Sequence, residues 1–391
     1  MRRNAGRLGF RLKRAAVLLL LPMLAACSWM RPSDGAKTHG AIDPPPADVE
    51  EMMLRQAEGL SAAPDGTQNV TQNGTQNQAA APASPSPTPD AEMAPEEMLT
   101  VYLLDPKGYL APMTLPAGTD NPSAMESLEA RAEAALSWLT ADPQKKDQLP
   151  YGFAAPLPEG VKAEEVRADP DSGMISVDFT DPLPVMTAAG ERKMIEALVW
   201  SMTELPGIDK VRLSVRGELI RTLPASGLPL EETLTRGIGI NIESLRGVHV
   251  ADSMAVTLYF PVRGDGGDGY FVPVTRLVSR SPDRTLAALE ALMDGPADTA
   301  ALARVWTNDF AIEDLEVRAD TVNVSLRGKG WTRDQPLPAE MLDSLVLTAT
   351  EAAGAPRVKI AVNGNETFVD TENRAYQLPV NRPAAVNTPK S

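Results

Sequence analysis

Hydrophobic and polar residues alternate in several short segments of the chain and recur at helical spacing in others. Residues 175–179 and 211–215 place an apolar side chain at every second position, which is the pattern of a strand with one buried face. Apolar residues at 195, 198, 199, 202 and 205 instead fall at positions i, i+3, i+4, i+7 and i+10, as on one face of a helix. The pattern therefore predicts half-buried strands and amphipathic helices.

This pattern occurs twice beyond residue 98. Gly108-Tyr109-Leu110-Ala111-Pro112-Met113-Thr114 corresponds to Gly269-Tyr270-Phe271-Val272-Pro273-Val274-Thr275, and Val166-Arg167-Ala168-Asp169 is identical to residues 317–320. The helical and strand positions from Ile195 to Val215 recur 147 positions later, from Leu342 to Val362. A repeat that holds its register over such a distance indicates two copies of one fold.

Each copy is predicted to run strand, strand, helix, strand, strand, helix, strand. The first helices are expected to begin at Asn121-Pro122 and at Ser281-Pro282, each with an N-cap residue followed by proline. Two helices on the buried face of a sheet make a two-layer sandwich. The predicted fold class is α+β, with two tandem two-layer α/β sandwich domains of the same ββαββαβ fold.

The sequence divides into six predicted segments, whose limits follow from these elements and from composition. Residues 1–26 are a signal peptide and 27–98 a disordered Pro/Gln-rich tether. The domains cover 99–230 and 253–371, joined by a linker at 231–252 and followed by a tail at 372–391. The linker contains Gly237-Ile238-Gly239-Ile240, which is apolar for a connecting segment. We therefore expect it to pack between the domains.

The amino terminus has the features of a bacterial lipoprotein signal. A basic start is followed by the apolar run 15–24, which is too short to span a bilayer. The run ends in Leu24-Ala25-Ala26-Cys27, which resembles the lipobox, and the chain has no other cysteine. The resemblance implies cleavage before Cys27, lipidation of its thiol, and a protein anchored to the outer face of the cytoplasmic membrane. An ordinary secretory signal followed by a free cysteine is the alternative.

Composition excludes several classes of partner and cofactor. The chain carries 37 Lys+Arg against 52 Asp+Glu, a formal net charge of −15, and it shows no basic stripe of the kind that binds nucleic acid. One cysteine and two histidines leave no disulfide framework and too few ligands for a zinc site. We therefore predict no nucleic-acid partner, no metal and no cofactor.

Four motifs are candidates for chemistry, and each has a simpler structural interpretation. Asp171-Ser172-Gly173 resembles an aspartic-protease signature, and Asp178 with Asp181 could form a general acid/base pair. The first is better explained as a hairpin turn and the second as a polar strand end. Gly264-Asp265-Gly266-Gly267-Asp268-Gly269 lacks the glutamate that would complete a calcium loop, and His249 has no second ligand nearby. We predict no catalytic residue.

The repeated motifs resemble GerMN domains. The resemblance covers about 99–371 and is strongest at 269–276 and 287–296. It implies a non-enzymatic envelope lipoprotein of sporulation or spore germination, with domains similar to ring-building motifs and with channel-assembly proteins as partners, in homo- or hetero-oligomers. The chain departs from the family pattern at 144–148 and 305–308. The alternative is an envelope ligand binder or cell-wall hydrolase that uses acidic loops around Asp178 and Asp265.

Overall fold

A computed structural model describes residues 98–117, 127–243, 250–262 and 269–388 of the chain. Every element below belongs to the unit Pro87–Ser391. His39, Cys27, Asp265 and His249 lie outside the described residues, and so do the signal peptide and most of the tether.

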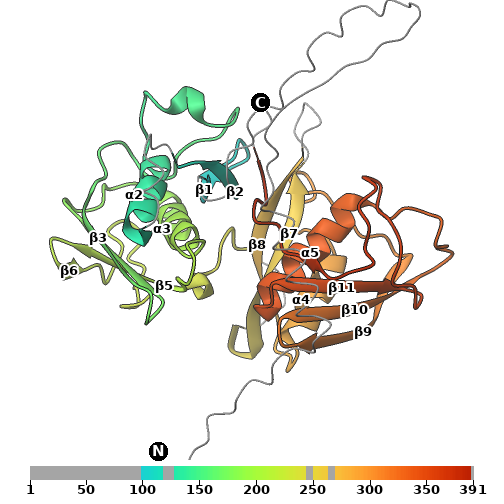
Figure 1. Ribbon diagram of the computed structural model, residues 1–391. Helices are drawn as coiled ribbons and strands as arrows, with labels where there is room; N and C mark the ends of the chain where they lie inside the picture. Colours follow the sequence, from blue (N-terminus) through green and yellow to red (C-terminus); the bar gives the residue numbers. More distant parts are fainter. Residues whose placement is uncertain (1–97, 118–126, 244–249, 263–268, 389–391) are drawn as a thin grey trace, which may run out of the picture. The chain divides into compact units, whose positions relative to one another are not determined.

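Two repeats of one fold occupy the described residues (Figure 1). The first contains β1 (Met98–Leu104), β2 (Leu110–Pro116), α2 (Leu128–Leu139), β3 (Ala163–Asp169), β4 (Met174–Phe179), α3 (Ala188–Met202), β5 (Lys210–Val215) and β6 (Glu218–Leu219). The second contains β7 (Ser253–Val262), β8 (Tyr270–Ser279), α4 (Arg284–Met293), β9 (Phe310–Arg318), β10 (Thr321–Gly328), α5 (Ala339–Ala353), β11 (Arg357–Val362) and β12 (Val380–Asn381). Short 3-10 helices occur at Lys146–Gln148, Arg236–Ile238 (η4) and Val250–Asp252.

Each repeat has a four-stranded sheet, in the order β3-β4-β5-β6 or β12-β11-β10-β9. The central pair is parallel and its neighbours are antiparallel, with Ile175 opposite Val211 in the first repeat and Val322 opposite Val358 in the second. The alternation predicted from the sequence is confirmed, because every second residue of β4 and β10 is buried. These apolar faces pack against the helices.

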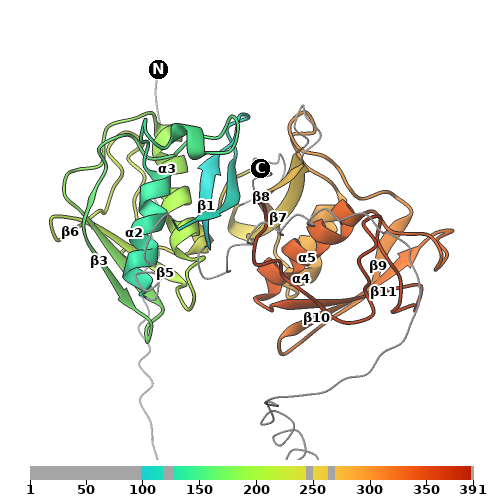
Figure 2. The same ribbon diagram turned by 45° about the horizontal axis from the view of Figure 1, so that its top comes forward.

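The first two strands of each repeat form a separate antiparallel hairpin, β1–β2 or β7–β8. In both views the helices lie between this hairpin and the larger sheet (Figure 2), and α2 contacts both β1 and β3. The mixed α/β class and the duplicated fold are as predicted. The hairpin adds a layer that the sequence analysis did not place.

The first helices begin later than predicted. Ser127 caps α2 by accepting a hydrogen bond from the amide of Ala130, and Asp283 caps α4 by accepting one from the amide of Leu286. Both have extended backbones, as N-caps require. The predicted start at Ser281 is wrong because Pro282 lies before the cap, and the start predicted at Asn121 lies outside the described residues.

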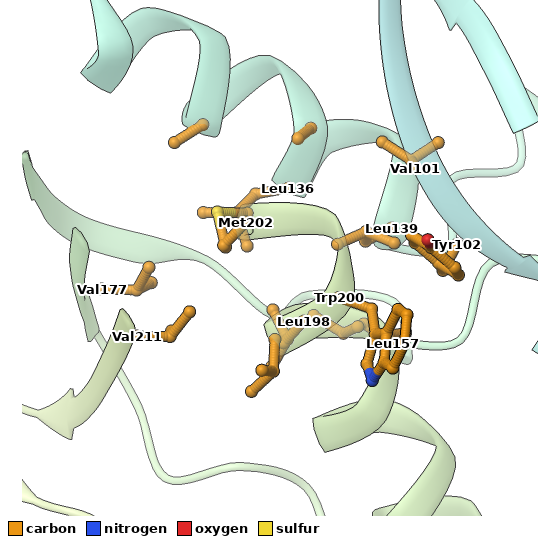
Figure 3. Close-up of a cluster of buried hydrophobic side chains, with 14 of the residues drawn as sticks. Val101, Tyr102, Leu136, Leu139, Leu157, Val177, Leu198, Trp200, Met202 and Val211 are labelled. Atoms are coloured by element: carbon orange, nitrogen blue, oxygen red, sulfur yellow. The ribbon is translucent and has the colours of Figure 1, made fainter. Parts of the chain in front are cut away.

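The core of the first repeat is continuous from the hairpin to the sheet (Figure 3). Leu136 and Leu139 of α2 and Leu198 of α3 pack among Val101, Val177 and Val211, and all are buried. Trp200 lies at the end of this cluster with its ring 5.6 Å from that of Tyr102, centroid to centroid, in an edge-on arrangement. The helices therefore pack between the two sheets through these buried side chains.

Candidate functional site

The polar residues that the structure brings together lie where the two repeats meet. Their backbone framework is the pair of hairpins, because β2 and β8 contact each other. Two asparagines, Asn241 and Asn387, join these strands, and both are buried. The segments that carry them are the ones that the sequence analysis assigned to a linker and a tail.

Each asparagine makes the same three hydrogen bonds, with the roles of the strands exchanged. Asn241 accepts a hydrogen bond from the amide of Leu110 at 2.9 Å and donates to the carbonyl oxygens of Leu110 and Pro273 at 2.8 and 2.7 Å. Asn387 accepts from the amide of Phe271 at 2.8 Å and donates to the carbonyl oxygens of Phe271 and Pro112 at 2.9 and 2.6 Å. The interface therefore has an approximate internal two-fold relation.

Replacing Asn241 or Asn387 by alanine is expected to cost about 1–3 kcal/mol in the free energy of unfolding, since either change leaves strand polar groups buried without a partner. Urea unfolding followed by circular dichroism measures the change. Asn308→Ala, at an exposed position, is the matched control and is expected to cost less than about 0.5 kcal/mol. Equal effects at all three positions would contradict this role.

An ionic cluster lies at the centre of the same interface. In the first repeat Glu204 accepts hydrogen bonds from the Tyr102 hydroxyl at 2.8 Å and from Arg236 at 2.6 Å. In the second, Glu351 accepts from the Tyr259 hydroxyl at 3.2 Å and from Arg382 at 3.0 Å. These are equivalent sets of one tyrosine, one glutamate and one arginine.

Arg236 connects the two sets. Its guanidinium donates to Glu204 of its own repeat and to Glu351 of the other, at 3.1 Å, and it lies 4.6 Å from the ring centroid of Trp200. Each arginine also donates a hydrogen bond to a threonine hydroxyl, Arg236 to Thr203 and Arg382 to Thr350. Charged groups in this low-polarity setting are stable only because each has a partner of opposite charge.

Burial raises the pKa of the Tyr102 hydroxyl, and Glu204 beside it raises that pKa further. Burial by itself would also raise the pKa of Glu204, but Arg236, Arg382 and the hydrogen bond from Tyr102 hold that pKa below its usual value. The tyrosine therefore stays a neutral donor and the glutamate a charged acceptor near neutral pH.

Acidification is expected to destabilise the interface through Glu204. Because its pKa is lower in the folded than in the unfolded protein, its contribution is complete above the unfolded value of about 4.3 and is lost as the pH falls through the folded value. The urea midpoint measured from neutral pH downward should therefore drop less steeply for Glu204→Gln than for the unaltered chain. Parallel curves for the two proteins would contradict this assignment.

The candidate catalytic residues are engaged in turns. Ser172 donates its hydroxyl proton to the Asp169 carboxylate at 2.7 Å, and Gly173 has a φ of 68°, so Asp171-Ser172-Gly173 forms the hairpin turn between β3 and β4. Asp178 accepts hydrogen bonds from the Ser214 hydroxyl at 2.6 Å and the amide of Gly217 at 2.9 Å. Asp181 pairs with Arg216. Both aspartates are thus bonded to groups at the end of β5 or in the turn that follows it.

In the part of the chain that the structure describes, no three His, Cys, Asp or Glu side chains gather closely enough to hold a metal ion. Nor does any helix there combine the length and hydrophobicity needed to cross a membrane. The two asparagines and the ionic cluster instead form an interface between the strands and helices of the two repeats.

The sequence analysis missed the residues of this interface, although a signal was present. Arg236 and Asn241 stand five positions apart, and so do Arg382 and Asn387. The two Arg-x4-Asn segments lie 146 positions from each other, close to the offset of the preceding helix and strand. Each repeat therefore continues through its Arg-x4-Asn segment.

The linker residues 237–240 were expected to pack between the domains. This holds at Ile240, which is buried and whose carbonyl oxygen accepts a hydrogen bond from the amide of Thr275.

These features define a protein of tandem, two-fold related α/β repeats joined by buried polar contacts. The chain belongs to the Germane family, described as "Sporulation and spore germination", which matches residues 100–221 and 257–368. It is 29% identical to the spore germination protein GerM of Bacillus subtilis (strain 168) over 299 residues, 74% of this chain and 78% of that protein.

The solved structure of the tandem GerMN domains of the sporulation protein GerM from Bacillus subtilis is similar to this fold. The TM-score is 0.67 at 28% sequence identity, over 74% of this chain and 99% of that one. The chain therefore has tandem GerMN domains, as the repeated motifs predicted.

Proposed function

We propose that this protein is a non-enzymatic envelope lipoprotein that serves as an assembly module in sporulation or spore germination. The observation that carries the proposal is the likeness of the whole tandem, over 74% of the chain, to the sporulation protein GerM. A role in a channel complex between mother cell and forespore is the finer form of the same proposal, and Cys27 would supply the lipid anchor.

The joined repeats support an assembly role because polar side chains hold them together as one scaffold. The side chains that meet at the interface are used in hydrogen bonds between strands and in ion pairs. Asp178, one of the two acidic positions on which the alternative hydrolase would depend, is bound to a hydroxyl and a backbone amide, and the other, Asp265, lies outside the described residues. We therefore infer that partner proteins bind the outer surfaces of the repeats.

The edges of the larger sheets are poorly suited to binding an added strand. The edge strands β3 and β9 each have a break in register, where Glu164 and Glu313 have no residue opposite. Bulges and charged side chains at an edge oppose pairing with another chain. The outer faces of the sheets therefore remain as the surfaces for partner proteins. On these faces Arg212 and Lys359 alternate with apolar residues that point inward.

In-cell crosslinking tests the partner and the surface together. We expect the unaltered chain to crosslink to envelope proteins during spore formation, and Arg212→Glu with Lys359→Glu to lose those products. Lys146→Glu, a single charge reversal of the same kind at an exposed position outside the sheets, is expected to keep them. Loss of crosslinks with Lys146→Glu as well would argue against the outer faces.

Disruption of the gene in its own host tests the developmental role, and labelled palmitate tests the anchor. We expect fewer heat-resistant or germinating spores without the protein, and no incorporation of label in Cys27→Ala. Normal spores in the disrupted strain would refute the developmental role. Equal labelling of Cys27→Ala and the unaltered chain would refute the anchor without affecting the assembly proposal.

A further inference from the structure

A cavity of about 750 Å³ opens between the β1–β2 turn, the first turns of α3 and the segment that follows η4. Its volume falls within the range of sites that take small ligands. Its lining residues include Lys107, Tyr109, Arg192, Lys193, Asn241 and Asp298. The sequence analysis placed no site here.

The acidic residues that line this cavity are already bonded to other groups. Glu196 accepts from Arg192 at 2.6 Å, and Glu243 accepts from Arg276 at 2.8 Å. Asp298 accepts a hydrogen bond from the Tyr109 hydroxyl at 3.0 Å. Two of the three carboxylates are therefore paired with arginines, and Asp298 is bonded to an uncharged donor.

The two lysines of the cavity bond to neutral oxygen atoms. Lys193 donates to the side-chain oxygen of Asn241, and Lys107 donates to the carbonyl oxygen of Ala301 at 3.1 Å. Among the described residues neither lysine has an ion pair, although the charges of Glu196 and Asp105 act on Lys193. Burial lowers the pKa of Lys193, since it weakens the hydration of the ammonium. A cation with unused donors is therefore held in a recess of an acidic protein.

The second repeat shows that the fold does not require these charges. By the offsets of the surrounding motifs, Lys193 corresponds to Glu340 and Lys107 corresponds to Asp268. Both positive residues of the first repeat are thus replaced by acids in the second. Because the same fold forms with either charge, the lysines are better explained by something that they bind.

We propose that this cavity binds the oxyanion group, a carboxylate or a phosphate, of a small ligand, with Lys193 as its main donor. An ammonium with free donors forms short, charge-assisted hydrogen bonds to such oxygens. Lys107, which is exposed, contributes a second positive charge beside it. This site is independent of the proposed assembly role and stands or falls separately.

Calorimetric titration of the whole chain, solubilised in detergent, tests the proposal with three probes: inorganic phosphate, N-acetyl-dialanine, and the amide of N-acetyl-dialanine. We expect saturable binding of at least one of the two anions and none of the amide. Lys193→Gln should weaken that binding by at least about tenfold, which corresponds to about 1.4 kcal/mol. Binding of phosphate alone or of the carboxylate alone identifies the source of the oxyanion.

Lys329→Gln removes one positive charge at an exposed position of the second repeat and is expected to leave the affinity unchanged. Thermal unfolding of each variant shows that the fold is intact. No saturable binding of either anion, or an equal loss in both variants, would overturn the proposal. So would sedimentation data showing that the lysines instead hold a second copy of the chain, with a dimer that disappears in Lys193→Gln.

Discussion

Replacement of Trp200 by alanine is expected to lower the free energy of unfolding by about 3–5 kcal/mol. The indole is fully buried, and its ring nitrogen donates to the carbonyl oxygen of Gly239 at 3.0 Å. Its faces and edges contact Tyr102 and the guanidinium of Arg236. The substitution therefore removes core packing, a hydrogen bond to the segment that leads into the interface, and a cation–π contact at once.

Urea unfolding followed by circular dichroism measures this loss. Trp200→Phe should fall between the unaltered chain and Trp200→Ala, because it keeps much of the packing but not the hydrogen bond. Tyr151→Ala is the matched control, since that aromatic side chain is fully exposed, and should change stability by less than about 0.5 kcal/mol. A cost for Trp200→Ala as small as that of the control would show that the core closes around the missing ring.

Replacement of Glu351 by glutamine is expected to cost about 3–5 kcal/mol, because it removes the counter-charge that two partly buried guanidinium groups share. The Glu351 side chain is 14% exposed and forms ion pairs with Arg236 at 3.1 Å and with Arg382 at 3.0 Å. Arg236 keeps Glu204 as a partner, whereas Arg382 has no other acid within ion-pairing distance in the described residues. We therefore expect most of the cost at Arg382.

The double variant Glu351→Gln, Arg382→Met should recover part of the stability, since the unpaired charge is removed with its partner. Glu313→Gln breaks a pair in which Arg327 and Glu313 are 68% and 44% exposed, so its cost should be at most about 1 kcal/mol. The midpoints of urea unfolding are measured for these three variants and compared with that of the unaltered chain. If the buried and exposed pairs cost the same, the cluster would not hold the repeats together.

The local sequence was sufficient to predict the helices and strands, because each depends on a residue pattern within one short segment. Ile175, Val177 and Phe179 read as one face of a strand, and that face is buried. The alignment of Ile195 with Leu342 predicted the second long helix of each repeat, and both helices run as expected. The start predicted at Ser281-Pro282 was misplaced because proline marks a turn before a cap as readily as the first turn of a helix.

The interface was beyond reach of the same reasoning because its partners are far apart in sequence. Nothing near Asn387 indicates that its amide lies between Pro112 and Phe271. Residues 372–391 lack a strong hydrophobic period and were assigned to a tail, yet they supply β12, Arg382 and Asn387. Only the offset between the two Arg-x4-Asn segments pointed to their role.

Hydrophobic periodicity and internal repetition by themselves determined that this chain contains two copies of one α/β fold, since both properties are written in the spacing of residues. The tertiary structure decided how polar groups are used, because hydrogen bonds and ion pairs depend on distances that folding creates. It placed the carboxylate of the suspected catalytic residue Asp178 in a hydrogen bond with the amide of Gly217, and it brought Arg236 to Glu351. It also left Lys193 in a cavity without an ion pair among the described residues.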